Sequence, residues 1–136
     1  MKIDFAFICD YADIISKINA LGIGFDTIYA AKVPIKHPLF YLVIQLRANV
    51  VEAGEKDVEV DIIDENGKGI IPAIRAKIRI PKPPAGTEST GRIAIAFRDV
   101  EFPQYGSYSL HVVVEKIEMV HVPFRVSPPP QTSVTA

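Results

Sequence analysis

The feature that most constrains the fold of this chain is an alternation of apolar and polar side chains with a period of two residues. Every second residue between Leu39 and Arg47 is a large apolar one: Phe40, Leu42, Ile44 and Leu46. The same period recurs over residues 57–64, 74–80, 92–98 and 109–114. Because successive side chains of a strand point to opposite faces, this pattern predicts strands with one buried face. We expect an all-β antiparallel fold of about seven to nine strands, a sandwich or a barrel.

Turn residues separate these strands. Asn66-Gly67 is the strongest short hairpin signal. Lys116–Glu118 reads as a three-residue connection, which pairs Val112 with Val122 and leaves His111 and His121 as diagonal neighbours on the outer face. The helical pattern is confined to Tyr11–Ile18, where a turn or two is the most we expect.

A tyrosine near the C-terminal end narrows the fold further. Tyr108 follows Gly106-Ser107 and precedes an alternating strand, in the manner of a tyrosine corner. This segment resembles the immunoglobulin-like sandwich, although the paired cysteines and the tryptophan of antibody domains are missing. The sequence therefore predicts a single immunoglobulin-like sandwich over residues 1–127, followed by a Pro-rich tail over residues 128–136.

Several short motifs resemble one family along nearly the whole chain. They are Cys9-Asp10-Tyr11-Ala12, the stretch from Asn19 to Phe25, the hairpin Asp64–Gly67 and the Gly-x-Tyr strand at Gly106. Together they are similar to a bacterial family of small, uncharacterised cytosolic proteins, from which Ile63 departs slightly. The resemblance implies a fold and no activity.

Charge and cysteine content restrict the classes of partner. Fifteen basic and sixteen acidic residues leave a net charge of -1, so we expect no nucleic-acid partner, whose binding needs concentrated positive charge. A single cysteine excludes an internal disulfide. No apolar run approaches the roughly 18–20 residues of a membrane span, and no secretory signal is recognisable. We expect a cytoplasmic protein without a membrane partner.

The side chains that could carry chemistry have simpler interpretations. His111 and His121 lie close enough to share a metal, but no carboxylate or thiol joins them on their hairpin face, and we interpret them as surface histidines. Cys9 alternates with Phe5 and Phe7, which indicates a buried thiol. The carboxylates near turns, Asp10, Asp13, Asp26 and Asp64, are typical of loop chemistry. We predict no catalytic residue, no metal and no cofactor.

Apolar residues on nominally wet faces indicate either a second buried face or a docking site. We predict a non-catalytic structural or adaptor module that acts through protein–protein contacts, self-association included. The residues of this predicted interface are Ile8, Tyr41, Val43, Val113, His111 and His121. The alternative is a module that binds a small ligand or carbohydrate with the loops around Pro81–Gly91.

Overall fold

Two facing β-sheets and one separate hairpin make up the computed structural model, which describes residues 1–130. Its strands are β1 (Lys2–Cys9), β2 (Tyr11–Ile15), β3 (Lys17–Leu21), β4 (Thr27–Tyr29), β5 (Ile35–Asn49), β6 (Gly54–Asp64), β7 (Ile74–Ile80), β8 (Glu88–Phe102), β9 (Gly106–Val114) and β10 (Ile117–Ser127). A single 3₁₀ turn, Val50–Glu52, follows β5 and is capped by the Asn49 side chain.

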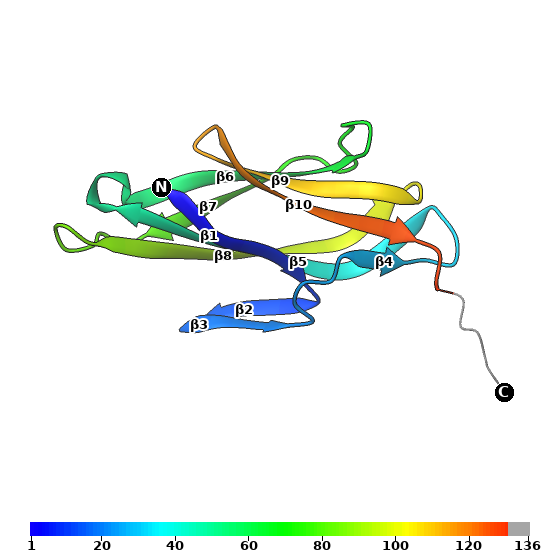
Figure 1. Cartoon of the computed structure of the whole chain (residues 1–136), viewed down its shortest axis with the longest axis horizontal. Coiled ribbons are helices and arrows are strands. Elements are labelled where there is room, and N and C mark those ends of the chain that lie inside the picture. The colour runs from blue at the N-terminus through cyan, green and yellow to red at the C-terminus, as the bar shows by residue number, and fades with distance from the viewer. Residues whose placement is uncertain (131–136) are drawn as a thin grey trace.

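The order of the strands is that of an immunoglobulin-like sandwich. One sheet has the order β1-β5-β8, and the other has the order β4-β10-β9-β6-β7 (Figure 1). All pairs are antiparallel except β4 with β10. The chain therefore starts in one sheet and crosses, at β4, to lie parallel to the last strand of the other. The predicted all-β sandwich is confirmed, with eight strands in its two sheets.

The core lies between the two sheets and consists of the residues that the alternation predicted to face inward. Phe40, Leu42, Ile44 and Leu46 of β5 have exposed fractions of 0–1%, and Leu110, Val112 and Val114 of β9 have 0%. Burial of such side chains stabilises the folded state by roughly 1.5–3 kcal/mol each. The rings of Phe40 and Phe97 stack across β5 and β8 with centroids 4.9 Å apart.

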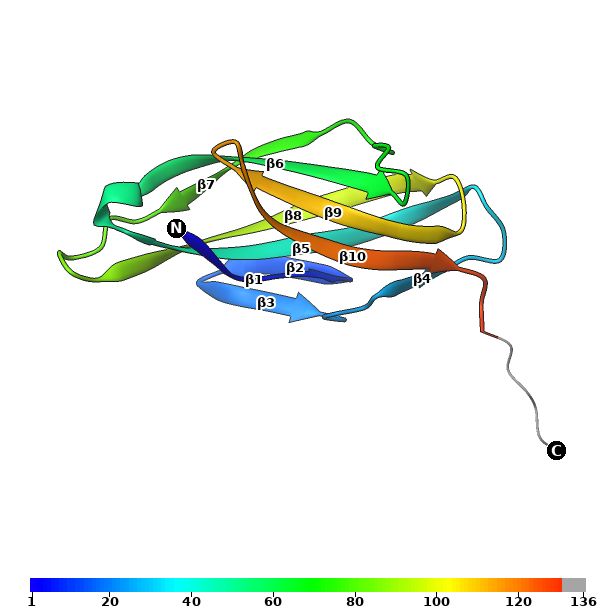
Figure 2. The ribbon, with the colours of Figure 1, turned by 45° about the horizontal axis from the view of Figure 1, so that its top comes forward.

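The segment after β1 is a β-hairpin and not a helical turn. β2 and β3 pair in register from Tyr11↔Leu21 to Ile15↔Lys17, and Ser16 turns the chain with a φ of 67°. The hairpin lies over the outer face of the β1-β5-β8 sheet as a third layer, on the side away from the larger sheet (Figures 1 and 2). The helical expectation fails because Tyr11, Ile14, Ile15 and Ile18, which have the spacing of one helix face, are divided between the two faces of a hairpin.

In β1, the face that points to the main core is the one that was predicted to be the outer face. Ile8 is buried in the main core, whereas Phe7 and Cys9 pack beneath the hairpin. A register shift between Ile3 and Phe5 returns Ile3 to the core side. Since both faces of β1 are covered, its apolar pattern carried no information about which face points inward.

The connection between β9 and β10 also differs from the expected one. Glu115 and Lys116 form a two-residue turn with φ values of 49° and 67°, and a bulge interrupts the ladder between Glu118 and Val120. Val112 therefore pairs with Val120, and His111 lies directly opposite His121. Val112 and Val122 still point to the same face of the sheet, as predicted. The bulge adds one residue to β10 and so offsets the turn being one residue shorter than expected.

Tyr108 forms the predicted tyrosine corner. Its exposed fraction is 4%, and its hydroxyl donates to the Gln104 carbonyl at 2.6 Å. The Gln104 amide donates to the same hydroxyl oxygen at 3.3 Å. Beyond β10, residues 128–130 are exposed, and the rest of the predicted Pro-rich tail, to residue 136, lies outside the described residues.

Candidate functional site

The residues of the predicted interface do not share one surface. Ile8 is 1% exposed inside the main core, and Val43 is 0% exposed beneath the β2–β3 hairpin. Tyr41 is partly buried there too, with its ring 5.4 Å from that of Tyr11 in an edge-on contact. The apolar outer face of β5 is thus a second buried face. This corrects the expectation that Ile8, Tyr41 and Val43 are available to a partner.

Four of the exposed large apolar side chains lie instead on the outward face of the hairpin or directly after it. Ile15 and Leu21 are 73% and 68% exposed, and Tyr11 is 44% exposed. Ile23, in the turn that follows β3, is 60% exposed. We call the outward side chains of the two strands the hairpin face, and they are Tyr11, Asp13, Ile15, Lys17, Asn19 and Leu21.

Local contacts hold the hairpin face in place. Asp13 accepts hydrogen bonds from the Asn19 side chain at 2.9 Å and from the Tyr11 hydroxyl at 3.2 Å. At the base of the hairpin, the Asp10 amide donates to the Leu21 carbonyl at 3.0 Å. Gly22 follows with a φ of 67°, where a Cβ would lie 2.1 Å from Asp10 Oδ2. The backbone conformation at this position therefore favours glycine.

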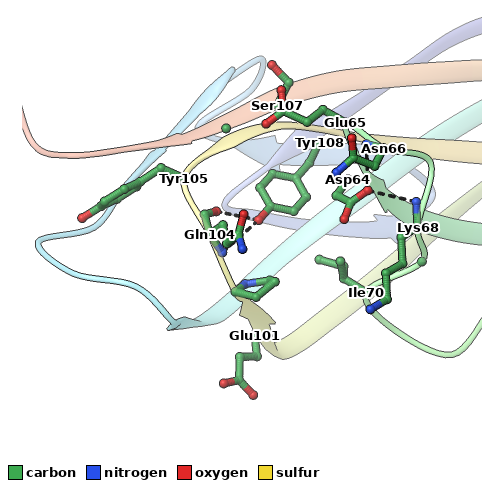
Figure 3. Close-up of a pocket in the computed structure, with 13 residues that line it drawn as sticks. Asp64, Glu65, Asn66, Lys68, Ile70, Glu101, Gln104, Tyr105, Ser107 and Tyr108 are labelled. Carbon is green, nitrogen blue, oxygen red and sulfur yellow. Dashed lines mark hydrogen bonds between the residues drawn. The ribbon is translucent and has the colours of Figure 1, made fainter.

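A pocket of about 530 Å³ lies at one end of the sandwich, between the β6–β7 and β8–β9 connections (Figure 3). Three carboxylates line it, those of Asp64, Glu65 and Glu101, together with Lys68 and the rings of Tyr105 and Tyr108. Asp64 is already engaged, since its Oδ1 accepts from the amides of Asn66 and Lys68 at 2.9 Å. The pocket is at the opposite end of β8 from the Pro81–Gly91 loop that was expected to bind a ligand.

A polar cluster occupies the outer face of the larger sheet. Ser109 Oγ lies 3.0 Å from His111 Nε2, and His111 Nδ1 lies 2.5 Å from Glu118 Oε1. The ring of His121 stacks on that of His111 with centroids 5.7 Å apart. The residues 1–130 contain no group of three or more His, Cys, Asp or Glu side chains that could hold a metal ion. Sequence reasoning missed the contact with Glu118, because it placed this residue in the connection, whereas the two-residue turn pairs it with Val113 on the outer face of the strands.

Residues 4–127 match a family of unknown function, DUF6941. This is nearly the whole of the described chain. The chain belongs to the DUF6941 family. The predicted membership of an uncharacterised family is thereby confirmed. No curated protein matches the sequence of this DUF6941 chain.

One solved structure similar to the DUF6941 chain is the Pseudomonas fluorescens alkylpurine DNA glycosylase AlkC bound to DNA containing an abasic site analog. The sequence identity is 17% and the TM-score is 0.47, over 93% of this chain and 30% of that one. The DUF6941 chain thus spans less than a third of the length of that protein. Because this neighbour is bound to DNA, the exclusion of nucleic acid from the partners is wrong as stated. A structural similarity with a TM-score of 0.47 does not support DNA binding by this chain.

The other candidate side chains of the DUF6941 chain lie apart. Cys9 is buried beneath the hairpin, and burial, followed by the nearby Asp10 charge, raises the pKa of its thiol. His37 packs against the ring of Phe40, and burial lowers its pKa. Asp26 accepts from the neighbouring Thr27 hydroxyl at 3.0 Å. None of the helical segments within residues 1–130 has the length and apolar character of a membrane span.

Proposed function

We propose that this protein is a binding module that acts through protein–protein contacts at the hairpin face. The observation that carries the proposal is the exposure of Tyr11, Ile15 and Leu21 on one side of a hairpin whose other side packs on the sheet through Ala12, Ile18 and Ala20. Apolar side chains gathered on a surface mark interaction sites when they are contiguous. The occupant that fits is a protein surface with apolar groups opposite Tyr11, Leu21 and Ile15 and a polar strip opposite the central Asp13–Asn19 pair.

The construction of the hairpin supports this proposal. A two-stranded hairpin is marginal in water unless it packs on something else. Here Ala12 and Ala20 pack on the sheet, so the outward residues are not required to hold the hairpin in place. Large apolar residues on the wet side then cost solubility and contribute little to folding, which favours a role in binding. A free, buried thiol at Cys9 agrees with a reducing compartment such as the bacterial cytoplasm.

The test is site-specific photocrosslinking in the cells that produce the protein. A photoreactive phenylalanine analogue at Leu21 should give discrete adducts that mass spectrometry identifies. The matched control carries the analogue at Val51, which is 87% exposed in the 3₁₀ turn. Adducts from Leu21 that are lost in Ile15→Lys would support the proposal. Equal adducts from Leu21 and Val51, or none from Leu21, would overturn it, and adducts with a second copy would show self-association.

The pocket at the tyrosine corner favours a second candidate function, the binding of a small ligand rich in hydroxyl groups. Its volume falls in the range of about 300–1,000 Å³ typical of ligand sites. Carboxylates accept hydrogen bonds from hydroxyl groups, and Tyr105 offers a ring on which an apolar sugar face can stack. The Tyr105 hydroxyl itself is engaged, since it donates to the Ala30 carbonyl at 2.8 Å.

A thermal-shift screen of mono- and disaccharides tests this second function. A ligand that binds only the folded state raises the melting temperature in a concentration-dependent way. Glu101→Gln should abolish the shift, and Glu88→Gln, at the other end of β8, should leave it unchanged. Absence of any shift at millimolar ligand would count against the pocket as a sugar site.

A further inference from the structure

We propose that Ser109 is an activated nucleophile that accepts acyl groups from carboxylic esters, with His111 as its general base and Glu118 as a positioning residue. This goes beyond the proposed binding function and concerns a different face of the molecule. The observation is a continuous pair of contacts, Ser109 Oγ to His111 Nε2 at 3.0 Å and His111 Nδ1 to Glu118 Oε1 at 2.5 Å.

The order of these contacts determines the protonation of the imidazole. A carboxylate can only accept, so the His111 nitrogen that faces Glu118 carries the proton in the neutral ring. The other nitrogen, Nε2, is then an acceptor and receives the hydrogen bond of the Ser109 hydroxyl. A nucleophile bonded to a base that a third group orients is the arrangement that activates serine for attack.

The local backbone brings the three groups together. Ser109 and His111 are two residues apart on β9 and therefore share its outer face. Glu118 pairs with Val113, and His121 pairs with His111, so both β10 side chains lie on this face only because of the bulge between Glu118 and Val120. Bulges are over-represented next to active sites, where they redirect a side chain.

The neighbouring groups have defined places around the cluster. His121 stacks on the His111 ring, and Asp61 of β6 lies opposite His111. The guanidinium of Arg125 donates to Ser107 Oγ at 3.3 Å, one position along the same face from Ser109. Arg125 is thus the cation available to a carbonyl oxygen that becomes negative at Ser109. The backbone amides of β9 pair with β6 and β10 and do not form an oxyanion hole.

The reaction balances with the groups present. Ser109 Oγ attacks the ester carbonyl while its proton moves to His111 Nε2, and a C–O bond forms. The ester C–O bond then breaks, and His111 returns the proton to the departing alcohol, which leaves Ser109 acylated. Because the face is open and lacks an oxyanion hole, we expect activated esters such as aryl acetates to react, and not amides.

The experiment measures covalent labelling of the purified full chain. p-Nitrophenyl acetate should release one p-nitrophenolate per chain and leave one acetyl group on Ser109 by peptide mass mapping, and a fluorophosphonate probe should label the same residue. Ser109→Ala should abolish both signals. The matched control Ser89→Ala, on β8 of the other sheet and remote from this cluster, should retain them. An adduct on another residue, or none at all, would overturn the proposal.

Variants of the other two residues test their roles separately. His111→Gln should slow labelling by about 100-fold, within the usual contribution of a general base, whereas His37→Gln, on β5 of the other sheet, should leave the rate within about twofold. Glu118→Gln should slow labelling at least about tenfold, because an amide does not enforce the required tautomer. Glu118→Asp should restore part of the rate, which a merely structural role for this side chain would not predict. Equal rates in wild type and His111→Gln would refute base catalysis.

Discussion

Two polar side chains show how single residues hold this sandwich together. Tyr108 joins β9 to the preceding loop through its two bonds with the Gln104 backbone. Asp4 joins β1 to β5, since it accepts from Gln45 at 2.8 Å and from both Arg47 Nε and Nη2 at 2.9–3.1 Å. No side-chain nitrogen or oxygen buried within residues 1–130 lacks a partner. Removal of either set of contacts should therefore lower the stability of the folded protein measurably.

Removal of the Tyr108 hydroxyl should destabilise the fold. Tyr108→Phe keeps the ring between Phe102 and Phe124 but leaves the Gln104 carbonyl and amide without their partner. We expect the free energy of unfolding in urea to fall by about 1–2 kcal/mol. The control is Tyr29→Phe, because the Tyr29 side chain is 57% exposed, and it should change stability by less than about 0.5 kcal/mol.

Asp4 should make stability depend on pH in the acid range. The hydrogen bonds from Arg47 and then Gln45 hold the pKa of Asp4 below its ordinary value. Its contribution is therefore fully present above the pKa of the unfolded chain, about 3.9, and is lost as the pH falls through the lower folded value. We expect Asp4→Asn to lose less stability than wild type between about pH 4 and pH 2. Asp57→Asn, which removes an exposed ion pair with Lys77, should keep the wild-type slope.

At the scale of the strands, the alternation predicted the inward residues where one face meets water. It failed for β1, because Ile8 and Cys9 are both buried, one in each apolar layer. It failed for the β2–β3 hairpin because each strand has only five residues, and the adjacent Ile14 and Ile15 are apolar on both faces. The register of β9 with β10 could not be predicted from the sequence. A two-residue turn followed by a bulge places the same residues inward as a three-residue loop without a bulge.

The hairpin should open independently of the sandwich, and Cys9 reports that opening. The thiol is fully buried beneath β2, so it reacts with a disulfide reagent only when the hairpin lifts. Ala12→Leu overfills the contact with Val43 and should speed native-state labelling of Cys9 at least about tenfold. Lys17→Leu adds the same side chain on the outward face and should leave the rate unchanged. An unchanged rate in Ala12→Leu would show that labelling requires global unfolding.

On the scale of the whole molecule, the two sheets close on each other where β7 meets β8. A Cβ at Gly91 would lie 2.8 Å from Ile80 Cγ1 and 2.9 Å from the Arg79 carbonyl oxygen. The sandwich thus has one core, and we expect one cooperative transition. The sequence placed Tyr41 and Val43 of the predicted interface on an open face, whereas the structure covers them with the hairpin. The prediction failed because coverage by the hairpin is a tertiary fact that no local pattern contains.

Enlargement of Gly91 should destabilise both sheets together. Gly91→Val drives methyl groups into Ile80 and the β7 backbone, and we expect a loss of about 2–3 kcal/mol. Far-UV circular dichroism and tyrosine fluorescence should give the same urea midpoint, lower than that of wild type. The control is Gly69→Ala, because a Cβ at Gly69 would lie 3.8 Å from its nearest neighbour, the Ile71 carbonyl oxygen. Separate midpoints for the two probes would contradict a single cooperative core.

Because the hairpin is a third layer, it is synthesised before the residues on which it packs. The hairpin leaves the ribosome before Val43 of β5 and well before Ala94 of β8, the residues against which its inner face packs. At about 5–20 residues per second, the stretch between Ala20 and Ala94 takes roughly 4–15 s to synthesise. During that interval a marginal hairpin has two apolar faces in water. The nascent chain is therefore exposed to aggregation and to chaperones between the emergence of the hairpin and that of β8, before the sandwich itself can close.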